Sequence, residues 1–161
     1  MSVDFPVTSA IRYLREKKVE FVPYLYEYVE KGGTRESAKH LGIDEHAVVK
    51  TLLFETNEKK PLIVLMHGDM EVSTKNLARF LGVKSVDPAS PEKASKLTGY
   101  LVGGTSPFGT RSNLPIYAEH TIFGLKKIYI NGGKRGFLVE INPQDLHSAL
   151  PVVEVEVAMA S

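Results

Sequence analysis

The chain has 161 residues, of which 43% are hydrophobic and 24% charged, the composition of one ordinary water-soluble globular domain. Its 20 basic and 19 acidic residues leave a formal charge of +1, so a nucleic-acid role would have to rest on a local basic patch. Cysteine is absent, which excludes a disulfide framework, a thiolate metal site and a cysteine nucleophile. The sequence shows no signal peptide and no apolar run approaching the roughly 18 residues of a membrane span, so we expect a cytoplasmic protein.

The first half of the chain is predicted to mix helices and strands. Thr8 and Ser9 can cap a helix with apolar positions on one face. Apolar runs predict strands over residues 21–28, 48–55 and 62–66, and Pro23 favours an edge position for the first. Helices are expected at residues 35–41, capped by Thr34, and after Ser73 or Thr74 as far as Gly82.

The second half is predicted to be richer in strands. Residues 83–86 suit a brief strand, and Ser90 with Pro91 opens a helix to residue 97. Further strands are expected at residues 101–102, 114–118, 126–131, 136–141 and 152–157, with a helical turn at 121–125 and a last helix over 143–150. This order favours a single α+β domain with a mixed sheet over a regular βαβ winding.

Residues 98–109, TGYLVGGTSPFG, form a constrained loop with paired glycines. Glycine removes the Cβ, so a ligand can approach the amides of Gly103 and Gly104 closely. Pro107 has a fixed φ and keeps Ser106 extended. The loop is neither GxGxxG nor a Walker sequence, so an ordinary glycine-rich turn between strands is an equal alternative to a binding loop.

Three further features have two interpretations each. Lys50 interrupts an apolar strand, so either its stem reaches solvent or its ammonium meets an anion in a pocket. Alternate tyrosines at 24, 26 and 28 share one face, which suits a core cover or a stacking wall for a base. His67 followed by Asp69 could be a base and the group that orients it, or a simple turn.

Elimination leaves chemistry of binding and polarisation. The five histidines lack metal-ligand spacing, so no metal or cofactor is predicted. Ser106 does not lie in a GxSxG elbow. The groups that remain can bind and polarise a carbonyl or a phosphate: the Lys50 ammonium, the hydroxyls of Tyr26, Thr51, Thr105 and Ser106, and the amides around Gly103 and Gly104.

Three ordered segments, residues 50–52 (KTL), 98–109 (TGYLVGGTSPFG) and 128–136 (IYINGGKRG), give the chain its resemblance to a known family. It resembles the YbaK/EbsC family of aminoacyl-tRNA deacylases, which are related to the editing domain inserted in bacterial prolyl-tRNA synthetases. The resemblance implies a compact α+β domain over residues 5–158 on a mixed, partly barrel-like sheet.

By position, the resemblance implies that Lys50 is the essential lysine and that Gly103 acts with it. Tyr26 and Thr51 match substrate-pocket residues, and Gly104, Thr105 and Ser106 belong to the same loop. Three positions depart from the family pattern. The stretch 67–70 is usually apolar before its Asp, Ile is common where Thr105 stands, and some members carry Asp where this chain has Leu138.

The resemblance implies removal of cysteine from mischarged Cys-tRNA(Pro), with the substrate's own thiol attacking the ester, so no protein nucleophile is needed. The partners would be the aminoacylated 3′ adenosine of a tRNA and prolyl-tRNA synthetase. Basic residues that could contact the tRNA backbone are Lys75, Arg79, Arg111, Lys134 and Arg135. The alternatives are deacylation of Ala-tRNA(Pro) or Ser-tRNA by water, a non-catalytic tRNA- or synthetase-binding module, and a generic small-ligand protein.

Overall fold

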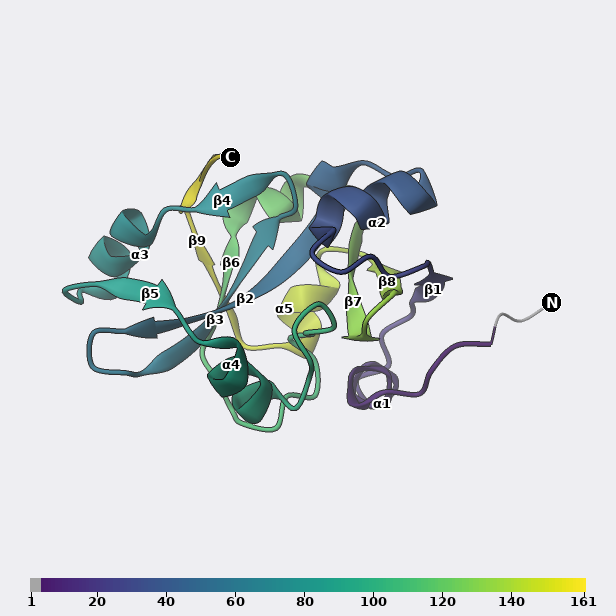
Figure 1. Cartoon of the computed structure of the whole chain (residues 1–161), viewed down its shortest axis with the longest axis horizontal. Coiled ribbons are helices and arrows are strands. Elements are labelled where there is room, and N and C mark those ends of the chain that lie inside the picture. Colours follow the sequence, from purple (N-terminus) through teal and green to yellow (C-terminus); the bar gives the residue numbers. More distant parts are fainter. Residues whose placement is uncertain (1–3) are drawn as a thin grey trace.

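The structure, a computed structural model, describes residues 4–161. Figure 1 shows one long sheet with short helices around it. The helices are α1 (Ser9–Glu16), α2 (Gly33–Leu41), α3 (Thr74–Leu81), α4 (Pro91–Thr98) and α5 (Asp145–Ala149), with 3₁₀ turns η1 (Glu45–Ala47) and η2 (His120–Gly124). The strands are β1 (Val22–Leu25), β2 (Val48–Thr56), β3 (Pro61–His67), β4 (Met70–Val72), β5 (Val86–Pro88), β6 (Ile116–Glu119), β7 (Ile128–Lys134), β8 (Phe137–Ile141), β9 (Val152–Val155) and β10 (Ala158–Ala160).

The main sheet has the strand order β1-β8-β7-β2-β3-β6-β9, with β5 added to β2, and β4 pairs separately with β10. Three pairs are parallel, β2 with β7, β3 with β6 and β6 with β9, while the other pairs are antiparallel. The mixed sheet with interspersed helices confirms the predicted α+β class.

Strand β2 changes its neighbour along its length. It pairs with β7 only at Val48 and Val49, and with β5 only from Phe54 to Thr56. On its other side it pairs with β3 without a break from Val49 to Glu55. The middle of β2 therefore has one strand neighbour instead of two, and this interruption divides the sheet into a β1-β8-β7 part and a β3-β6-β9 part.

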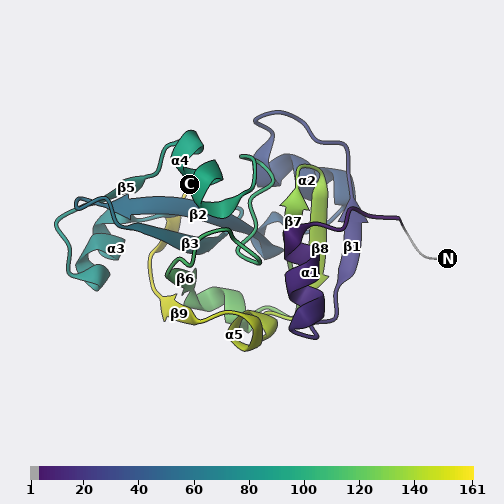
Figure 2. The same cartoon turned by 90° about the horizontal axis from the view of Figure 1, so that it is seen from below.

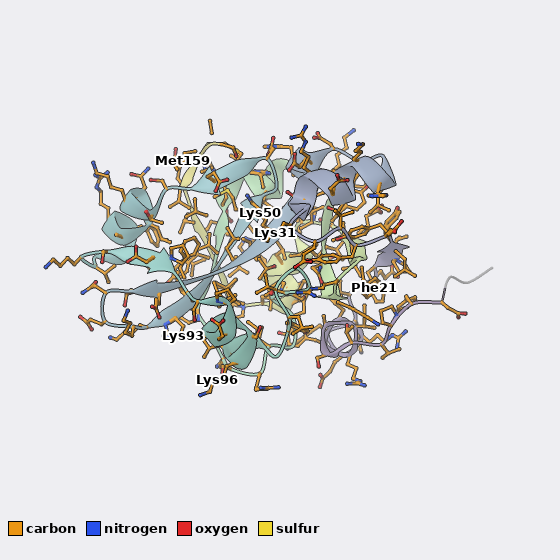
Figure 3. All side chains as sticks on the ribbon, in the orientation of Figure 1. Phe21, Lys31, Lys50, Lys93, Lys96 and Met159 are labelled. Carbon is orange, nitrogen blue, oxygen red and sulfur yellow. The ribbon has the colours of Figure 1, made fainter. Side chains whose placement is uncertain are left out.

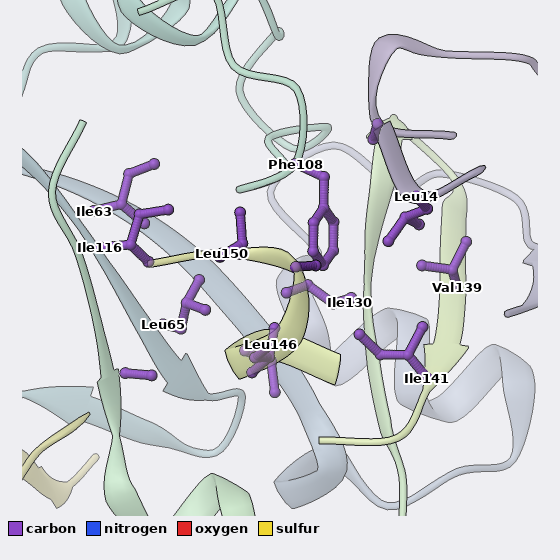
Figure 4. Packing of buried hydrophobic residues seen from close by; sticks show 14 of the residues in the cluster. Leu14, Ile63, Leu65, Phe108, Ile116, Ile130, Val139, Ile141, Leu146 and Leu150 are labelled. Atoms are coloured by element: carbon purple, nitrogen blue, oxygen red, sulfur yellow. The ribbon is translucent and has the colours of Figure 1, made fainter. Parts of the chain in front are cut away.

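One face of the sheet carries a continuous core. Figure 4 shows residues of this cluster, with Phe108 at its centre between Leu14 of α1 and Leu150 after α5. It joins both parts of the sheet, because Ile63 of β3 and Ile130 of β7 belong to the same cluster. Figure 2 shows α1 and α5 placed against the sheet, as such a core requires.

The opposite face carries two separate apolar clusters. One lies around β2, β3 and α3 and includes Phe54 and Met66. The other lies around α2, β7 and β8 and includes Val48 and Leu138. The first and third β2 positions on this face thus belong to different environments, with Lys50 between them.

Several predicted helix ends are confirmed. The side chains of Thr8, Ser73 and Ser90 each accept a hydrogen bond from the backbone amide three residues later, so they are N-caps. Gly42 and Gly82 end their helices in the left-handed conformation that glycine favours.

Three predicted elements have other bounds or caps in the structure. Thr34 does not cap α2, because the helix begins one residue earlier and the Thr34 hydroxyl bonds Glu45 and the Gly68 carbonyl. The first strand ends at Leu25, before Tyr26 and Tyr28. The brief strand expected at 83–86 lies at Val86–Pro88.

The short apolar strand expected after Gly99 is absent. Leu101 and Val102 are 65% and 48% exposed and lie in turns. Tyr100 anchors this segment instead, since its buried hydroxyl donates to the Phe108 carbonyl and burial raises the pKa of Tyr100 to about 12. The buried Tyr100 ring, and not a strand, therefore holds this segment in place.

Among residues 4–161, no helix has both the length and the apolar character that crossing a membrane requires.

Candidate functional site

Lys50 is partly buried near the middle of the molecule (Figure 3), where the pairing between β2 and β7 has just ended. Its ammonium Nζ donates to the backbone carbonyl of Met70 at 2.6 Å. In residues 4–161 no carboxylate lies within ion-pair distance of this ammonium. The positive charge is thus held by a neutral acceptor and stays available to an anionic ligand. The Lys50 stem therefore lies inside the fold with its ammonium bonded to the Met70 carbonyl, and the interpretation in which it meets an anion stays a prediction.

The neighbours of Lys50 on its face of the sheet come from three strands. Val49 pairs with Ile130, so Lys50 lies beside Asn131, the first β7 residue beyond the paired region. Asn131 in turn pairs with Leu138 of β8, and Leu138 pairs with Tyr24 of β1. Paired residues share a face, so the apolar Leu138 stands in this row with Asn131 and Tyr24.

Tyr26 lies on the same side of the sheet as Lys50. It packs against the cluster that contains Val48 and Leu138, with its ring tilted on His40 at a centroid distance of 6.4 Å. Burial raises the pKa of Tyr26, so its phenol stays protonated and can donate a hydrogen bond. Tyr24 donates to Glu140 and Tyr28 stacks with Arg135, so the alternate tyrosines serve three different contacts.

Thr51 lies on the opposite face from Lys50, beside Val49 and Leu53 of the continuous core. Its hydroxyl Oγ1 is buried and has no hydrogen-bond partner. A buried hydroxyl in this state costs about 1–3 kcal/mol, so it is a rare feature in a folded protein.

The backbone of Thr51 is also unpaired on one side. The Gly68 amide donates to the Val48 carbonyl at 2.6 Å, so even-numbered β2 residues direct their backbone groups to β3 and odd-numbered ones away from it. On this edge Val49 pairs with Ile130 of β7, and the Leu53 carbonyl accepts from the Ala89 amide. No strand within the described chain pairs with Thr51 on this edge. Thr51 thus offers an amide, a carbonyl and a hydroxyl at the interruption of the sheet.

The glycine loop is tied to the β7–β8 hairpin through its carbonyl groups. The Gly103 carbonyl accepts from Asn131 Nδ2 at 3.1 Å, and the Val102 carbonyl accepts from Arg135 Nε at 2.8 Å. The Arg135 guanidinium also lies 5.1 Å from the centre of the Tyr28 ring. Asn131 thus joins the loop to the strand position next to Lys50.

Gly103 needs to be glycine at this position. Its φ is +89°, and a Cβ there would lie 2.5 Å from the Tyr28 hydroxyl oxygen. Among residues 4–161 its amide donates to no protein atom. Gly103 therefore supplies a free N–H beside the Asn131 side chain, as the sequence led us to expect.

The other loop residues have different roles. The Gly104 amide donates to the Leu101 carbonyl at 2.8 Å, so it is not free, contrary to our expectation. The Thr105 hydroxyl bonds the same carbonyl at 3.4 Å. Ser106 is fully buried and its hydroxyl accepts from the Phe108 amide at 3.2 Å, so it shapes the loop.

Sequence reasoning missed Asn131 as part of the site, and it did not connect Tyr28 or Arg135 with the glycine loop. The signal was present in the motif of residues 128–136, which was used only for the resemblance. Their contacts with the loop span 28 residues or more in sequence for Asn131 and Arg135, so no local pattern reveals them.

Two surface hollows lie away from this region. One is lined by residues between α1 and β1 and by Lys126 and Lys127, and the other by α4 with Arg111. Neither includes Lys50 or the glycine loop. The free polar groups at the interruption of β2, and not the size of a hollow, mark the candidate site.

Comparison with known proteins shows the class to which the chain belongs. A family model described as an aminoacyl-tRNA editing domain matches residues 31–149, which is most of the chain. The chain therefore belongs to the family of aminoacyl-tRNA editing domains. The relation indicated by the three sequence motifs is confirmed at this level.

Individual relatives agree. The chain is 31% identical over 142 residues to EbsC of Enterococcus faecalis, named as a candidate Cys-tRNA(Pro)/Cys-tRNA(Cys) deacylase, and the match covers 88% of this chain and 87% of that protein. It is 33% identical over 102 residues to the proline–tRNA ligase of Ligilactobacillus salivarius, covering 63% of this chain and 18% of the ligase.

Solved structures share the fold. A hypothetical protein superposes with a TM-score of 0.85 at 24% identity, covering 94% of this chain and 99% of that one. A candidate trans-editing enzyme for prolyl-tRNA synthetase superposes with a TM-score of 0.81 at 23% identity, covering 94% and 98%.

Proposed function

We propose that this protein removes cysteine from mischarged Cys-tRNA(Pro) in trans. The family membership and the name given to the Enterococcus faecalis relative support this substrate. The single structural observation behind the proposal is the interruption of β2, where a cation and several unpaired polar groups adjoin the glycine loop.

The site residues divide into two roles in this proposal. The amides of Gly103 and Thr51 donate to the ester carbonyl oxygen as negative charge develops on it. Lys50 neutralises a phosphate or the ribose-linked charge at the terminal adenosine, since its ammonium has no carboxylate partner within the described residues. The phenol of Tyr26 lies on the Lys50 face of the sheet and donates a hydrogen bond to the substrate there.

The substrate supplies the nucleophile. The cysteine sulfur attacks its own ester carbonyl, a C–S bond forms, and the bond from that carbon to the ribose oxygen breaks. The thiol proton passes to the leaving ribose oxygen, so the products are a cyclic thiolactone and free tRNA. The protein's contribution is orientation and charge stabilisation, and the chain contains no cysteine of its own to compete.

The decisive experiment is deacylation of tRNA(Pro) charged with cysteine, alanine or serine, with product analysis for thiolactone. We expect rapid release from Cys-tRNA(Pro) only, because alanine has no thiol and serine has a poorer nucleophile. Equal rates on alanine or serine esters would show that water, and not the substrate thiol, attacks the ester. No turnover on any of them would leave a tRNA- or synthetase-binding module.

Lys50→Ala is the inactive control for this panel, and Lys96→Ala is its match, since Lys96 is an exposed lysine of α4 (Figure 3). We expect a loss of about a hundredfold or more for the first, the size seen when one transition-state donor is removed. The second should behave like the parent protein. Equal activity of the two variants would refute the assignment of Lys50.

The formal charge of +1 predicts modest affinity for tRNA alone. We therefore propose that prolyl-tRNA synthetase contributes to tRNA selection as a partner. Adding the synthetase should lower the KM for Cys-tRNA(Pro), and the effect should weaken as salt increases. An unchanged KM across synthetase concentrations would exclude this role.

A further inference from the structure

His67 is the least expected residue near the site. It ends β3, is 0% exposed, and uses both ring nitrogens. Nδ1 lies 2.7 Å from the His46 carbonyl, and Nε2 lies 2.7 Å from the Thr121 hydroxyl. A carbonyl can only accept, so Nδ1 carries the proton and Nε2 of the neutral ring accepts from Thr121. The ring is also stacked on His46 at 3.8 Å.

His67 opens a tight turn, residues 67–70, that is bonded on several sides. The Gly68 amide donates to the Val48 carbonyl, and the Gly68 carbonyl accepts from the Thr34 hydroxyl at 3.1 Å. Asp69 bonds His46 Nδ1 at 2.8 Å, so Asp69 does not orient His67 and the base-with-orienter interpretation is wrong. A Cβ on Gly68 would lie 2.8 Å from the Glu45 carbonyl oxygen, so the turn packs tightly against η1.

This turn carries the acceptor for Lys50. The Met70 carbonyl, three residues after His67, accepts from Lys50 Nζ at 2.6 Å. The β8 residue paired with Asn131, beside Lys50, is Leu138, which has no carboxylate. The position of the ammonium therefore depends on the position of the turn.

A second route links His67 to Met70. Thr121 contacts Glu119 at 3.5 Å, and Glu119, which is 2% exposed, accepts from the amides of Val157 and Ala158. Ala158 begins β10, which pairs with β4 through Ala160 and Met70. The buried ring thus braces the turn from η1 on one side and from η2 and β10 on the other.

We propose that His67 is a positioning residue for Lys50: its bonds to His46 and Thr121 fix the turn whose Met70 carbonyl directs the ammonium toward the anionic part of the substrate. This inference rests on the proposed function for the role of Lys50, and it adds a residue that does not touch the substrate.

The proton state of His67 gives the proposal a pH signature. Burial lowers the pKa of His67. The charged and titratable groups around it are His46, Asp69, Glu119 and His120, the last beside Glu119 at 3.5 Å. Protonation would place a proton on Nε2, and Thr121 would have to turn its own proton toward Glu119. Because burial disfavours the charged ring, acid should loosen the turn.

The sign for stability follows from the same shift. As pH falls, the unfolded chain takes up this proton at the ordinary value of 6.5, before the buried ring does. The free energy of unfolding is thus intact above that value and declines as pH drops through it toward the lower folded-state pKa.

The test uses three variants and a matched control. His67→Leu removes both bonds, His67→Asn keeps a donor for the His46 carbonyl, and Thr121→Val removes the partner of Nε2. His120→Asn changes a histidine that also adjoins Glu119 but is 47% exposed. We expect His67→Leu to lower kcat about tenfold with KM within about twofold, and His67→Asn to recover most of this loss. The control should match the parent.

The acid limb of the kcat profile that reports His67 should be absent in His67→Leu and present in His120→Asn. A further readout needs no tRNA: reductive methylation of the free protein, with Lys50 compared with exposed Lys96 by mass spectrometry. We expect Lys50 to react about fivefold faster in His67→Leu, since loss of its bond exposes the ammonium. If His67→Leu does not fold, His67→Asn and Thr121→Val carry the comparison.

Unchanged Lys50 reactivity and an unchanged pH profile in the folded His67 and Thr121 variants would overturn the proposal. A reactive Lys50 in His67→Leu with no deacylation by the parent protein would instead uphold the positioning role and refute the proposed function.

Discussion

The two faces of the sheet are built differently. One face has a single buried cluster that crosses the whole sheet, from Ile63 on β3 to Val139 on β8. The other has two clusters, one under α3 and one under α2, with Lys50 between Leu52 and Val48 at their border. Both faces use the same strands, so the difference arises at the middle of β2.

The two faces differ in the continuity of their packing. The continuous face holds the two parts of the sheet together, because its residues contact both. The divided face leaves room for a cation and unpaired backbone groups without breaking the fold. A polar site is tolerated where a core is already interrupted, since few apolar contacts are lost there.

The largest expected effect tests the continuous face. Phe108→Ala removes a fully buried ring at the centre of this cluster and should destabilise the protein by about 3–5 kcal/mol. Phe80→Ala removes a ring that is 53% exposed on α3 and should change stability by only about 0.5 kcal/mol. Urea unfolding measures both, and similar losses would contradict the assignment of the core.

The next effect concerns the divided face. Lys50→Met places an unbranched apolar side chain between the two clusters, so we expect thermal stability to stay equal or to rise. Deacylation should fall about a hundredfold or more, as the cation is lost. Lys96→Met on exposed α4 should leave activity unchanged. A clear loss of stability in Lys50→Met would mean that the ammonium supports the fold.

A smaller effect concerns the glycine loop. Gly103→Ala meets both a positive φ and the Tyr28 hydroxyl, so we expect a loss of about 1–3 kcal/mol and about tenfold slower deacylation. Gly124→Ala has nothing within 4 Å of the added Cβ and should be neutral. Calorimetry and deacylation assays on the pair give the comparison, and a neutral Gly103→Ala would exclude a role for loop geometry.

The smallest effect compares two threonines of one strand. Thr51→Val removes a buried hydroxyl that has no partner within residues 4–161, so it should stabilise the protein by about 1 kcal/mol, with deacylation kept because the Thr51 amide remains. Thr56→Val removes a hydroxyl that accepts from the backbone amides of Glu58 and Lys60. It should destabilise the protein by about 1 kcal/mol and leave deacylation unchanged. The same sign of stability change in both would show that the Thr51 hydroxyl has a partner in solution.

Local structure was largely predictable from the sequence. Ser73 and Ser90 mark helix starts through their own side chains, and the apolar run of β3 predicts a buried central strand. Lys50 and Gly103 could be singled out because a charge in an apolar strand and paired glycines are locally unusual. These signals depend on residues close together in the chain.

Long-range contacts account for what could not be predicted. The choice of β7 and then β5 as neighbours of β2 joins segments far apart in sequence. His67 could be flagged but not interpreted, because Thr121 lies 54 residues away. The Gly104 amide was misassigned because Leu101, whose carbonyl accepts from it, lies in an irregular segment and not in the strand that the apolar run suggested.

The interruption of β2 also has a mechanical consequence. A continuous sheet resists twisting between neighbouring strands because backbone bonds run along both edges of each one. Around Thr51 one edge of β2 has no such bonds, so between Val49 and Leu53 the strand is held by backbone pairing on its β3 edge alone. A ligand that bonds the Thr51 backbone on one side and the glycine loop on the other would supply the hydrogen bonds that this edge of β2 lacks.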